Sequence, residues 1–147
     1  MKPIYQTEFG KYGNCYSACL ASITEIDLDS IPNFTIYCDK SKWFEAVRKW
    51  TRYYLRCDML CVSFRRSDKD LKLHGYWIAS GPTCSDTFHS VVMLDDSMVH
   101  DPDPYNMGII SIYTGDVLVP IDIVRGMKLN KDGLVSSLEM QKDRTNY

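Results

Sequence analysis

Three residues whose types can act together in nucleophilic catalysis follow one another along the chain: Cys15, His89 and Asp101. A cysteine attacks a carbonyl as the thiolate, so it needs an imidazole beside it and an acceptor that fixes the imidazole tautomer. Cys15 opens a helix-like run, His89 opens a strand-like run, and Asp101 is followed by a proline. We therefore interpret Cys15 as the nucleophile, His89 as the base and Asp101 as the residue that orients the base.

The sequence around Cys15 predicts a helix that begins at this residue and runs to Ile26. Small and apolar side chains recur there at helical spacing, at Cys15, Ala18, Cys19, Ser22, Ile23 and Ile26. In the first turn of a helix, unpaired N–H groups and the positive end of the dipole favour a thiolate. Cys19 lies one turn further on, where this effect has faded, and we expect it in the core. The alternative for Cys15 is plain burial, which is common for free cysteines.

His89 and Asp101 can meet only if the chain turns back between them. The segment Asp95–Ser97 predicts a tight turn between two strands, so the chain from His89 to Asp101 forms a hairpin. His89 and Asp101 then lie together at its open end. The neighbouring His100 should point to the opposite face of an extended strand, and it is the alternative base if the register differs by one residue. Asp101 before Pro102 is also typical of plain turns.

The remaining pattern predicts an α+β domain, with helices first and antiparallel strands after them. A second helix is expected over Ser41–Leu55, and its apolar positions, which favour a core face, are Trp43, Phe44, Val47, Trp50 and Tyr54. Strands are expected over Met59–Phe64, Gly75–Ala79, His89–Leu94, Ile109–Tyr113 and Val117–Ile121. Thr114–Asp116 predicts a hairpin turn between the last two strands. We expect one domain over residues 1–135 and a polar tail over residues 136–147.

The composition is that of one globular domain with a single core: 147 residues, 45% hydrophobic and 24% charged. The net charge of −2 gives no overall attraction to nucleic acid or to an anionic membrane. No window reaches the roughly 20 apolar residues of a membrane span, and the first residues lack the apolar core of a signal peptide. We therefore expect a cytoplasmic protein, and we expect neither a membrane nor nucleic acid as its partner.

The cysteines and a cluster of basic residues could also bind ligands, and we interpret both groups as structural. The six cysteines should be reduced in a cytoplasmic protein. The pairs Cys15/Cys19 and Cys57/Cys61 have the spacing of zinc ligands, but the expected helix and strand around them favour buried thiols, so we predict no metal. A basic cluster with interleaved aromatic residues suits nucleic acid, but we favour a solvated helix face. Its members are Lys40, Lys42, Arg48, Lys49, Arg52, Arg56, Arg65 and Arg66.

The order and setting of these motifs resemble the papain-like cysteine peptidase superfamily. The likeness is to the branch of bacteriocin-processing (double-glycine leader) peptidases and to its small phage and bacterial relatives. That branch has a cysteine at a helix start, a histidine that leads an apolar strand, and Asp-Pro shortly after. The matching segments of this chain are Asn14–Ser22, Ile31–Phe34, Gly75–Gly81, His89–Leu94 and Val99–Pro102.

The resemblance implies a papain-like fold, with the cysteine-bearing helix packed on an antiparallel sheet, and a hydrolase or acyltransferase that acts on an amide bond. Cys15, His89 and Asp101 would form its triad, and no metal or organic cofactor is implied. The family also has a glutamine that donates to the oxyanion. That glutamine lies closer to its cysteine than Gln6 lies to Cys15, so Asn14 or the Cys15 backbone N–H is the alternative donor.

The resemblance leaves the substrate open. It implies a peptide or protein substrate, which would be a host protein in the host cytoplasm if the chain is encoded by a phage. A deamidase, a transglutaminase-like enzyme or an isopeptidase would use the same triad. The alternative of another class is a catalytically silent papain-like protein that inhibits a host factor, with exposed tyrosine and tryptophan side chains as anchors.

Overall fold

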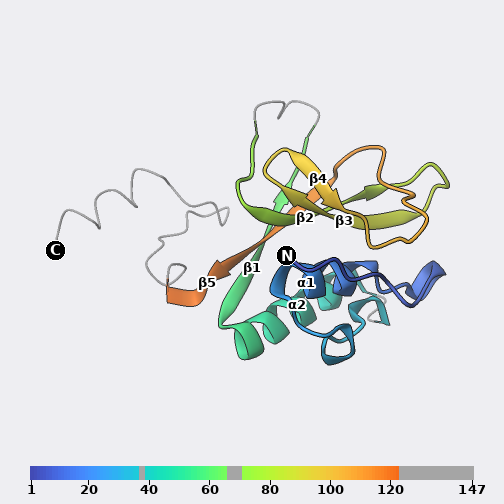
Figure 1. Ribbon diagram of the computed structural model, residues 1–147. Helices are drawn as coiled ribbons and strands as arrows, with labels where there is room; N and C mark the ends of the chain where they lie inside the picture. Colours follow the sequence, from blue (N-terminus) through green and yellow to red (C-terminus); the bar gives the residue numbers. More distant parts are fainter. Residues whose placement is uncertain (37–38, 66–70, 123–147) are drawn as a thin grey trace.

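The computed structural model describes residues 1–36, 39–65 and 71–122 (Figure 1). The expected tail over residues 136–147 therefore lies outside the described residues. The helical elements are η1 (Gly10–Tyr12), α1 (Cys15–Thr24), η2 (Leu28–Ser30), η3 (Phe34–Ile36), α2 (Lys40–Trp50) and the π-helical turn η4 (Thr51–Leu55). The strands are β1 (Cys57–Ser63), β2 (Tyr76–Pro82), β3 (Phe88–Leu94), β4 (Ser97–His100) and β5 (Thr114–Pro120).

The fold is α+β, as predicted, and consists of two α-helices and one antiparallel sheet with the strand order β1-β5-β2-β3-β4. Figure 1 shows α1 and α2 together on one face of the sheet. Alternate residues of the central strands belong to two hydrophobic clusters, one on each face of the sheet. On the first face, Ile78 and Val92 pack with the helices. Trp77 and Val91 pack on the opposite face, which the segments around Leu73 and 109–112 cover. The described helices include none long and apolar enough to cross a membrane.

Helix α1 begins at Cys15, as predicted, and ends at Thr24 rather than at Ile26. It ends because Glu25 adopts a left-handed conformation with φ of 59°. The predicted single apolar stripe was too narrow, since all residues from Tyr16 to Ser22 are buried. The sheet covers one side of α1, and the chain around Pro32, whose carbonyl accepts a hydrogen bond from Ser17 Oγ, covers another. The small residues of α1 make this enclosure possible.

The second predicted helix is confirmed. Helix α2 runs from Lys40 to Trp50, and η4 continues it to Leu55. Val47 and Trp50 are buried in the core, and Trp43 and Phe44 pack against it. The core interpretation is therefore correct for Trp43, Phe44, Val47 and Trp50, but it is wrong for Tyr54, which is 65% exposed.

The predicted strand over Ile109–Tyr113 and its hairpin with Val117–Ile121 are wrong. The segment 109–113 is irregular, and Thr114, Gly115 and Asp116 lie inside β5 rather than in a turn. Thr114, Gly115 and Asp116 pair with β1 on one edge and with β2 on the other, so they are strand residues and cannot form the hairpin turn. The segment instead runs past the end of β2, where the Ile110 N–H donates to the Pro82 carbonyl.

Two glycines are required by close packing rather than by turns. A Cβ atom on Gly115 would lie within 3.0 Å of the Leu73, Phe64 and Trp77 side chains. A Cβ atom on Gly81 would collide with the Ser111 carbonyl. Gly115 therefore lets neighbouring side chains pack directly against the backbone of β5. Close approach of this kind is one reason for a glycine inside a strand.

Candidate active site

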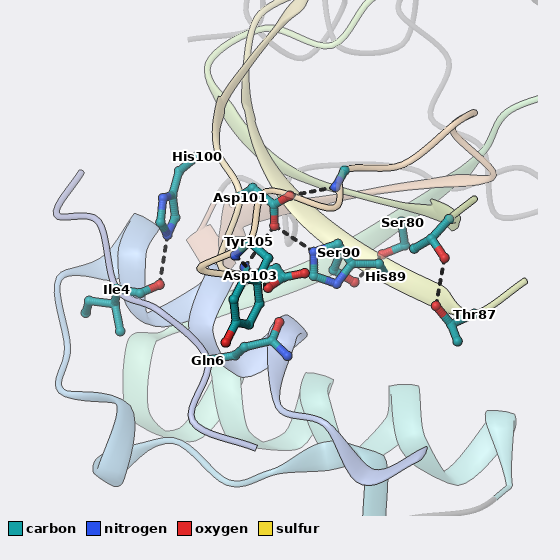
Figure 2. Close-up of polar contacts among 12 residues, drawn as sticks. Ile4, Gln6, Ser80, Thr87, His89, Ser90, His100, Asp101, Asp103 and Tyr105 are labelled. Atoms are coloured by element: carbon teal, nitrogen blue, oxygen red, sulfur yellow. Dashed lines mark hydrogen bonds and ion pairs between the residues drawn. The ribbon is translucent and has the colours of Figure 1, made fainter. Parts of the chain in front are cut away.

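The hairpin of β3 and β4 brings His89 to Asp101, as predicted. Leu94 pairs with Ser97 across the two-residue turn, and Val92 pairs with His100. The His89 Nε2 atom lies 2.7 Å from Asp101 Oδ1 (Figure 2), and both side chains are almost fully buried. This geometry fixes the His89 ring and leaves Nδ1 as the nitrogen that faces away from Asp101.

The start of α1 brings Cys15 to the same imidazole. Burial lowers the pKa of His89, but hydrogen bonds and charge interactions with Cys15 and Asp101 outweigh burial and raise it to about 9. His89 is therefore protonated at neutral pH and forms the centre of a Cys15–His89–Asp101 arrangement. Cys15 itself is half-buried, lies at the first position of α1 and lines a cavity with His89. Backbone N–H groups at a helix start have no intrahelical partner and favour negative charge.

Cys19, one turn further along α1, has a different environment. Its side chain is completely buried in the core, as predicted. Burial, followed by the charges of Cys15 and Asp101, raises the pKa of the Cys19 thiol well above its usual value. Cys19 therefore stays a neutral thiol, and the two cysteines of this helix lie in different environments.

Asp101 is held by the loop that follows β4. Its Oδ1 atom also accepts the Asp103 backbone N–H at 2.8 Å, and its Oδ2 atom accepts the Gly108 backbone N–H at 2.8 Å. Figure 2 shows these contacts together with the bond to His89. Both carboxylate oxygens are thus satisfied, so Asp101 can hold one orientation against His89.

Gln6 reaches the cavity because the N-terminal segment is fixed on two sides. The Ile4 N–H donates to Ser22 Oγ of α1, and the Gln6 N–H donates to the Pro102 carbonyl after β4. The Gln6 side chain lines the same cavity as Cys15, and its Nε2 atom donates to the Glu8 carbonyl at 3.1 Å. Gln6 therefore lines the same cavity as Cys15, although it lies nine residues before it in the sequence.

Asn14 is engaged in a different contact. Its Oδ1 atom accepts the backbone N–H groups of Thr7 and Glu8, both at 3.0 Å, and its Nδ2 atom donates to Thr7 Oγ1. The Asn14 side chain thus braces the loop that follows Gln6, and it is not among the residues that line the cavity. Of the two predicted oxyanion donors, the structure brings Gln6 to the cavity.

His100 points away from Asp101 and His89. Its Nε2 atom lies 2.8 Å from the Ile4 carbonyl, and its ring contacts Tyr5 edge to face. Figure 2 shows this separate position. His100 therefore helps to hold the N-terminal segment that carries Gln6.

The cavity has a volume of about 460 Å³, and Cys15 and His89 both line it. Its lining includes a set of hydroxyl groups and a set of apolar side chains that are exposed on the surface, which we call the hydroxyl wall and the rim. The hydroxyl wall contains Ser80, Ser90, Thr83, Thr87, Thr35 and Thr114, and the rim contains Phe9, Phe88, Tyr105 and Met107. Sequence patterns did not identify these residues, because they come from six separate parts of the chain.

A buried tyrosine fixes the helix start against the sheet. The Tyr16 hydroxyl donates to Asp116 Oδ2 on β5 at 2.8 Å, and both residues are buried. Burial, followed by the charge and hydrogen bond of Asp116, raises the pKa of Tyr16 well above its usual value, so its hydroxyl remains a donor. This contact ties the residue next to Cys15 to a central strand.

The other groups considered from the sequence lie elsewhere. No three His, Cys, Asp or Glu side chains among residues 1–36, 39–65 and 71–122 are placed to hold a metal ion. Cys61 is exposed on the edge strand β1, so its prediction as a buried thiol is wrong.

Arg48 and Arg52 of the basic cluster bind Asp58, with nitrogen to oxygen distances of 2.9 and 2.6 Å. These two arginines are thus partly neutralised rather than free on a helix face.

Comparisons of the chain with protein-family models, with curated proteins and with solved structures gave no match.

Proposed function

We propose that the chain is a papain-like cysteine hydrolase or acyltransferase that acts on an amide or peptide bond. Cys15 is the nucleophile, His89 the general acid and base, and Asp101 the residue that orients His89. The observation that carries the proposal is the contact of one buried imidazole with Asp101 on one side and Cys15 on the other, beside an open cavity. The α+β arrangement with Cys15 at the start of a buried helix supports the papain-like assignment.

The first chemical step forms a thioester. The Cys15 thiolate attacks the carbonyl carbon, and the electron pair of the C=O bond moves to oxygen. When the tetrahedral intermediate collapses, the C–N bond breaks and His89 gives its proton to the leaving amine. The carbonyl group is then bound to Cys15, and His89 is neutral.

The second step releases the acyl group. Water or an amine attacks the thioester carbon, His89 takes the proton of the attacking group, and the C–S bond breaks to restore the thiolate and the imidazolium. Water gives hydrolysis, and an amine gives acyl transfer. A deamidase or an isopeptidase follows the same steps on a side-chain amide.

Gln6 is our preferred donor to the oxyanion, together with the Cys15 backbone N–H at the start of α1. Gln6 lines the cavity, and its Nε2 atom, which donates to the Glu8 carbonyl, carries a second N–H, whereas Asn14 does not line the cavity. A donor must lie near the developing charge, about 3 Å away. Removal of one such donor typically lowers turnover about 10²- to 10³-fold, which is the loss we assign to Gln6→Ala.

The substrate in this proposal is a peptide or a protein, and a host protein if the chain is encoded by a phage and acts in the host cytoplasm. The exposed aromatic side chains favour a second candidate, a papain-like protein that binds a host factor without turnover. Tyr105 is 86% exposed, and Phe88 is 59% exposed, at the mouth of the cavity. Aromatic side chains of this kind anchor many interfaces.

An active ester distinguishes the two candidates without knowledge of the substrate. p-Nitrophenyl acetate should acylate the folded protein rapidly, release one equivalent of nitrophenolate in a burst, and add one acetyl group at Cys15 by intact and peptide mass spectrometry. The matched control is Cys84→Ala, because Cys84 is an exposed thiol outside the cavity. The burst should survive Cys84→Ala and vanish in His89→Ala. Equal acylation of Cys15 and Cys84 in the unaltered protein would favour the silent binding protein.

A further inference from the structure

The loop that follows β4 places a second carboxylate, Asp103, in the wall of the cavity. Asp103 is 7% exposed and lines the cavity together with Cys15 and His89. Its Oδ1 atom accepts the Tyr105 backbone N–H at 3.0 Å. Its Oδ2 atom accepts no hydrogen bond from the described residues and keeps access to solvent. One carboxylate oxygen is therefore available to a molecule in the cavity.

Asp103 differs from Asp101 because its charge is not compensated. Asp101 pairs with His89, whereas no Lys, Arg or His of residues 1–36, 39–65 and 71–122 forms an ion pair with Asp103. Burial of a carboxylate without a cationic partner costs free energy, and a bound cation would offset that cost. The aromatic rings of Tyr105 and Phe88 at the same mouth also favour a cation.

The position of Asp103 indicates which part of a substrate it meets. Asp103 lies two residues after Asp101, and Figure 2 shows it grouped with Tyr105 and His89. His89 gives its proton to the leaving amine and takes a proton from the group that attacks the thioester. Both groups must therefore approach on the His89 side of the cavity, which is the side of Asp103.

We propose that Asp103 is a specificity-determining residue that binds an ammonium or guanidinium group on the amine side of the reacting bond. This inference rests on the proposed function and adds the substrate class: amides whose amine component carries a second, cationic group, as a lysine or arginine residue does. In acyl transfer the α-amine of such a residue attacks the thioester carbon. The new C–N bond forms, the C–S bond breaks, His89 takes the amine proton, and Asp103 holds the side-chain cation.

The test uses the acetyl-enzyme formed from p-nitrophenyl acetate and two acceptor amines with the same carbon chain, lysinamide, which carries a terminal ammonium group, and norleucinamide, which lacks it. At equal concentration lysinamide should speed deacetylation about 10- to 100-fold more than norleucinamide, the range expected for a hydrogen bond between charged groups. Asp103→Asn keeps the Oδ1 acceptor for the Tyr105 N–H but removes the charge, so this ratio should fall to near one. The matched control, Asp96→Asn on the distant β3–β4 turn, should keep the ratio.

Each outcome decides the proposal. A ratio near one in the unaltered protein, including the case in which neither amine speeds deacetylation, overturns the role of Asp103. A ratio that survives Asp103→Asn overturns it as well. Should Asp103→Asn fail to fold, the unaltered protein still tests the idea, because rising salt should reduce the preference for lysinamide if it is electrostatic. Absence of acetylation at Cys15 contradicts the proposed function instead, and so the two failures are distinguishable.

Discussion

Two buried carboxylates, Asp58 and Asp101, bind cationic partners in two regions of the molecule, and their surroundings differ. Asp58 on β1 is 1% exposed and receives two bonds from Arg48 and one from Arg52, which tie α2 and η4 to the edge of the sheet. Asp101 is 4% exposed and receives its charged bond from His89. A guanidinium keeps its charge at every relevant pH, whereas an imidazolium can release a proton.

The partners decide what each carboxylate can do. Burial raises the pKa of Asp58, but the hydrogen bonds from Arg48 and Arg52 outweigh burial and hold it well below its usual range. The result is a permanent ion pair that joins two elements. The pKa of His89 is raised to about 9 by Cys15 and Asp101 against the effect of burial, which makes its proton available for transfer. The same type of buried acid therefore supports structure in one region and supports chemistry in the other.

The largest effect should come from removal of the nucleophile. Cys15→Ala should abolish the burst with p-nitrophenyl acetate completely, because Cys15 is the one thiol among the described residues that line the cavity. The free energy of unfolding should change little, since Cys15 is only half-buried. Nitrophenolate release and urea denaturation measure both quantities. A residual burst on the Cys15→Ala protein would mean that another cysteine is the nucleophile.

A smaller but still large effect should follow from Asp101→Asn. The substitution keeps the size of the side chain but allows the wrong tautomer of His89, so acylation should fall about 10²- to 10⁴-fold without complete loss. Alkylation of Cys15 by a small reagent should remain measurable. Stopped-flow acylation rates test this, and a change of less than threefold would contradict an orienting role for Asp101.

Asp58→Asn should have the opposite result to Asp101→Asn, because it should lower stability and leave the acylation of Cys15 unchanged. Loss of the charged bonds to Arg48 and Arg52 should lower the free energy of unfolding by about 2 kcal/mol, a value reduced by the partial exposure of both arginines. Acylation of Cys15 per folded molecule should be unchanged. Because the pKa of Asp58 lies below its unfolded value, this stabilisation is present above about pH 4 and is lost as the pH falls further. Urea unfolding at pH 7 and pH 3 measures the difference, which should shrink at pH 3.

The smallest effect should come from His100→Ala. His100 holds the Ile4 carbonyl and contacts Tyr5, so its loss should loosen the segment that carries Gln6. One hydrogen bond contributes about 1 kcal/mol, so acylation should fall by less than about tenfold. If His100→Ala instead abolishes acylation while His89→Ala preserves it, His100 is the base.

Local sequence signals predicted the parts of the site that depend on neighbouring residues. The two-residue turn after Leu94 determines the pairing of β3 with β4, and this pairing brings Asp101 to His89. The small residues after Cys15 indicated a helix that begins at the cysteine. The resemblance to a known family suggested the third contact, between Cys15 and His89, which no local pattern could predict.

Contacts between distant segments explain what the sequence did not predict. An apolar run such as Ile109–Tyr113 becomes a strand only if a free sheet edge is present, and the start of β5, over residues 114–116, is paired on both edges. Gln6 reaches the cavity through bonds to Ser22 and Pro102, which lie far along the chain. Arg48 and Arg52 were interpreted as a solvated face because Asp58, their partner, lies on the next element.

The central claim is that Cys15 and His89 act as one chemical unit, and the pH dependence of Cys15 alkylation tests it most directly. In the unaltered protein iodoacetamide should label Cys15 rapidly at pH 6, where ordinary thiols with a pKa near 8.5 are almost unreactive. The rate should show an inflection at about pH 9, where His89 loses its proton. In His89→Ala the rapid labelling at pH 6 should be lost. Superimposable profiles of the two proteins would contradict the account.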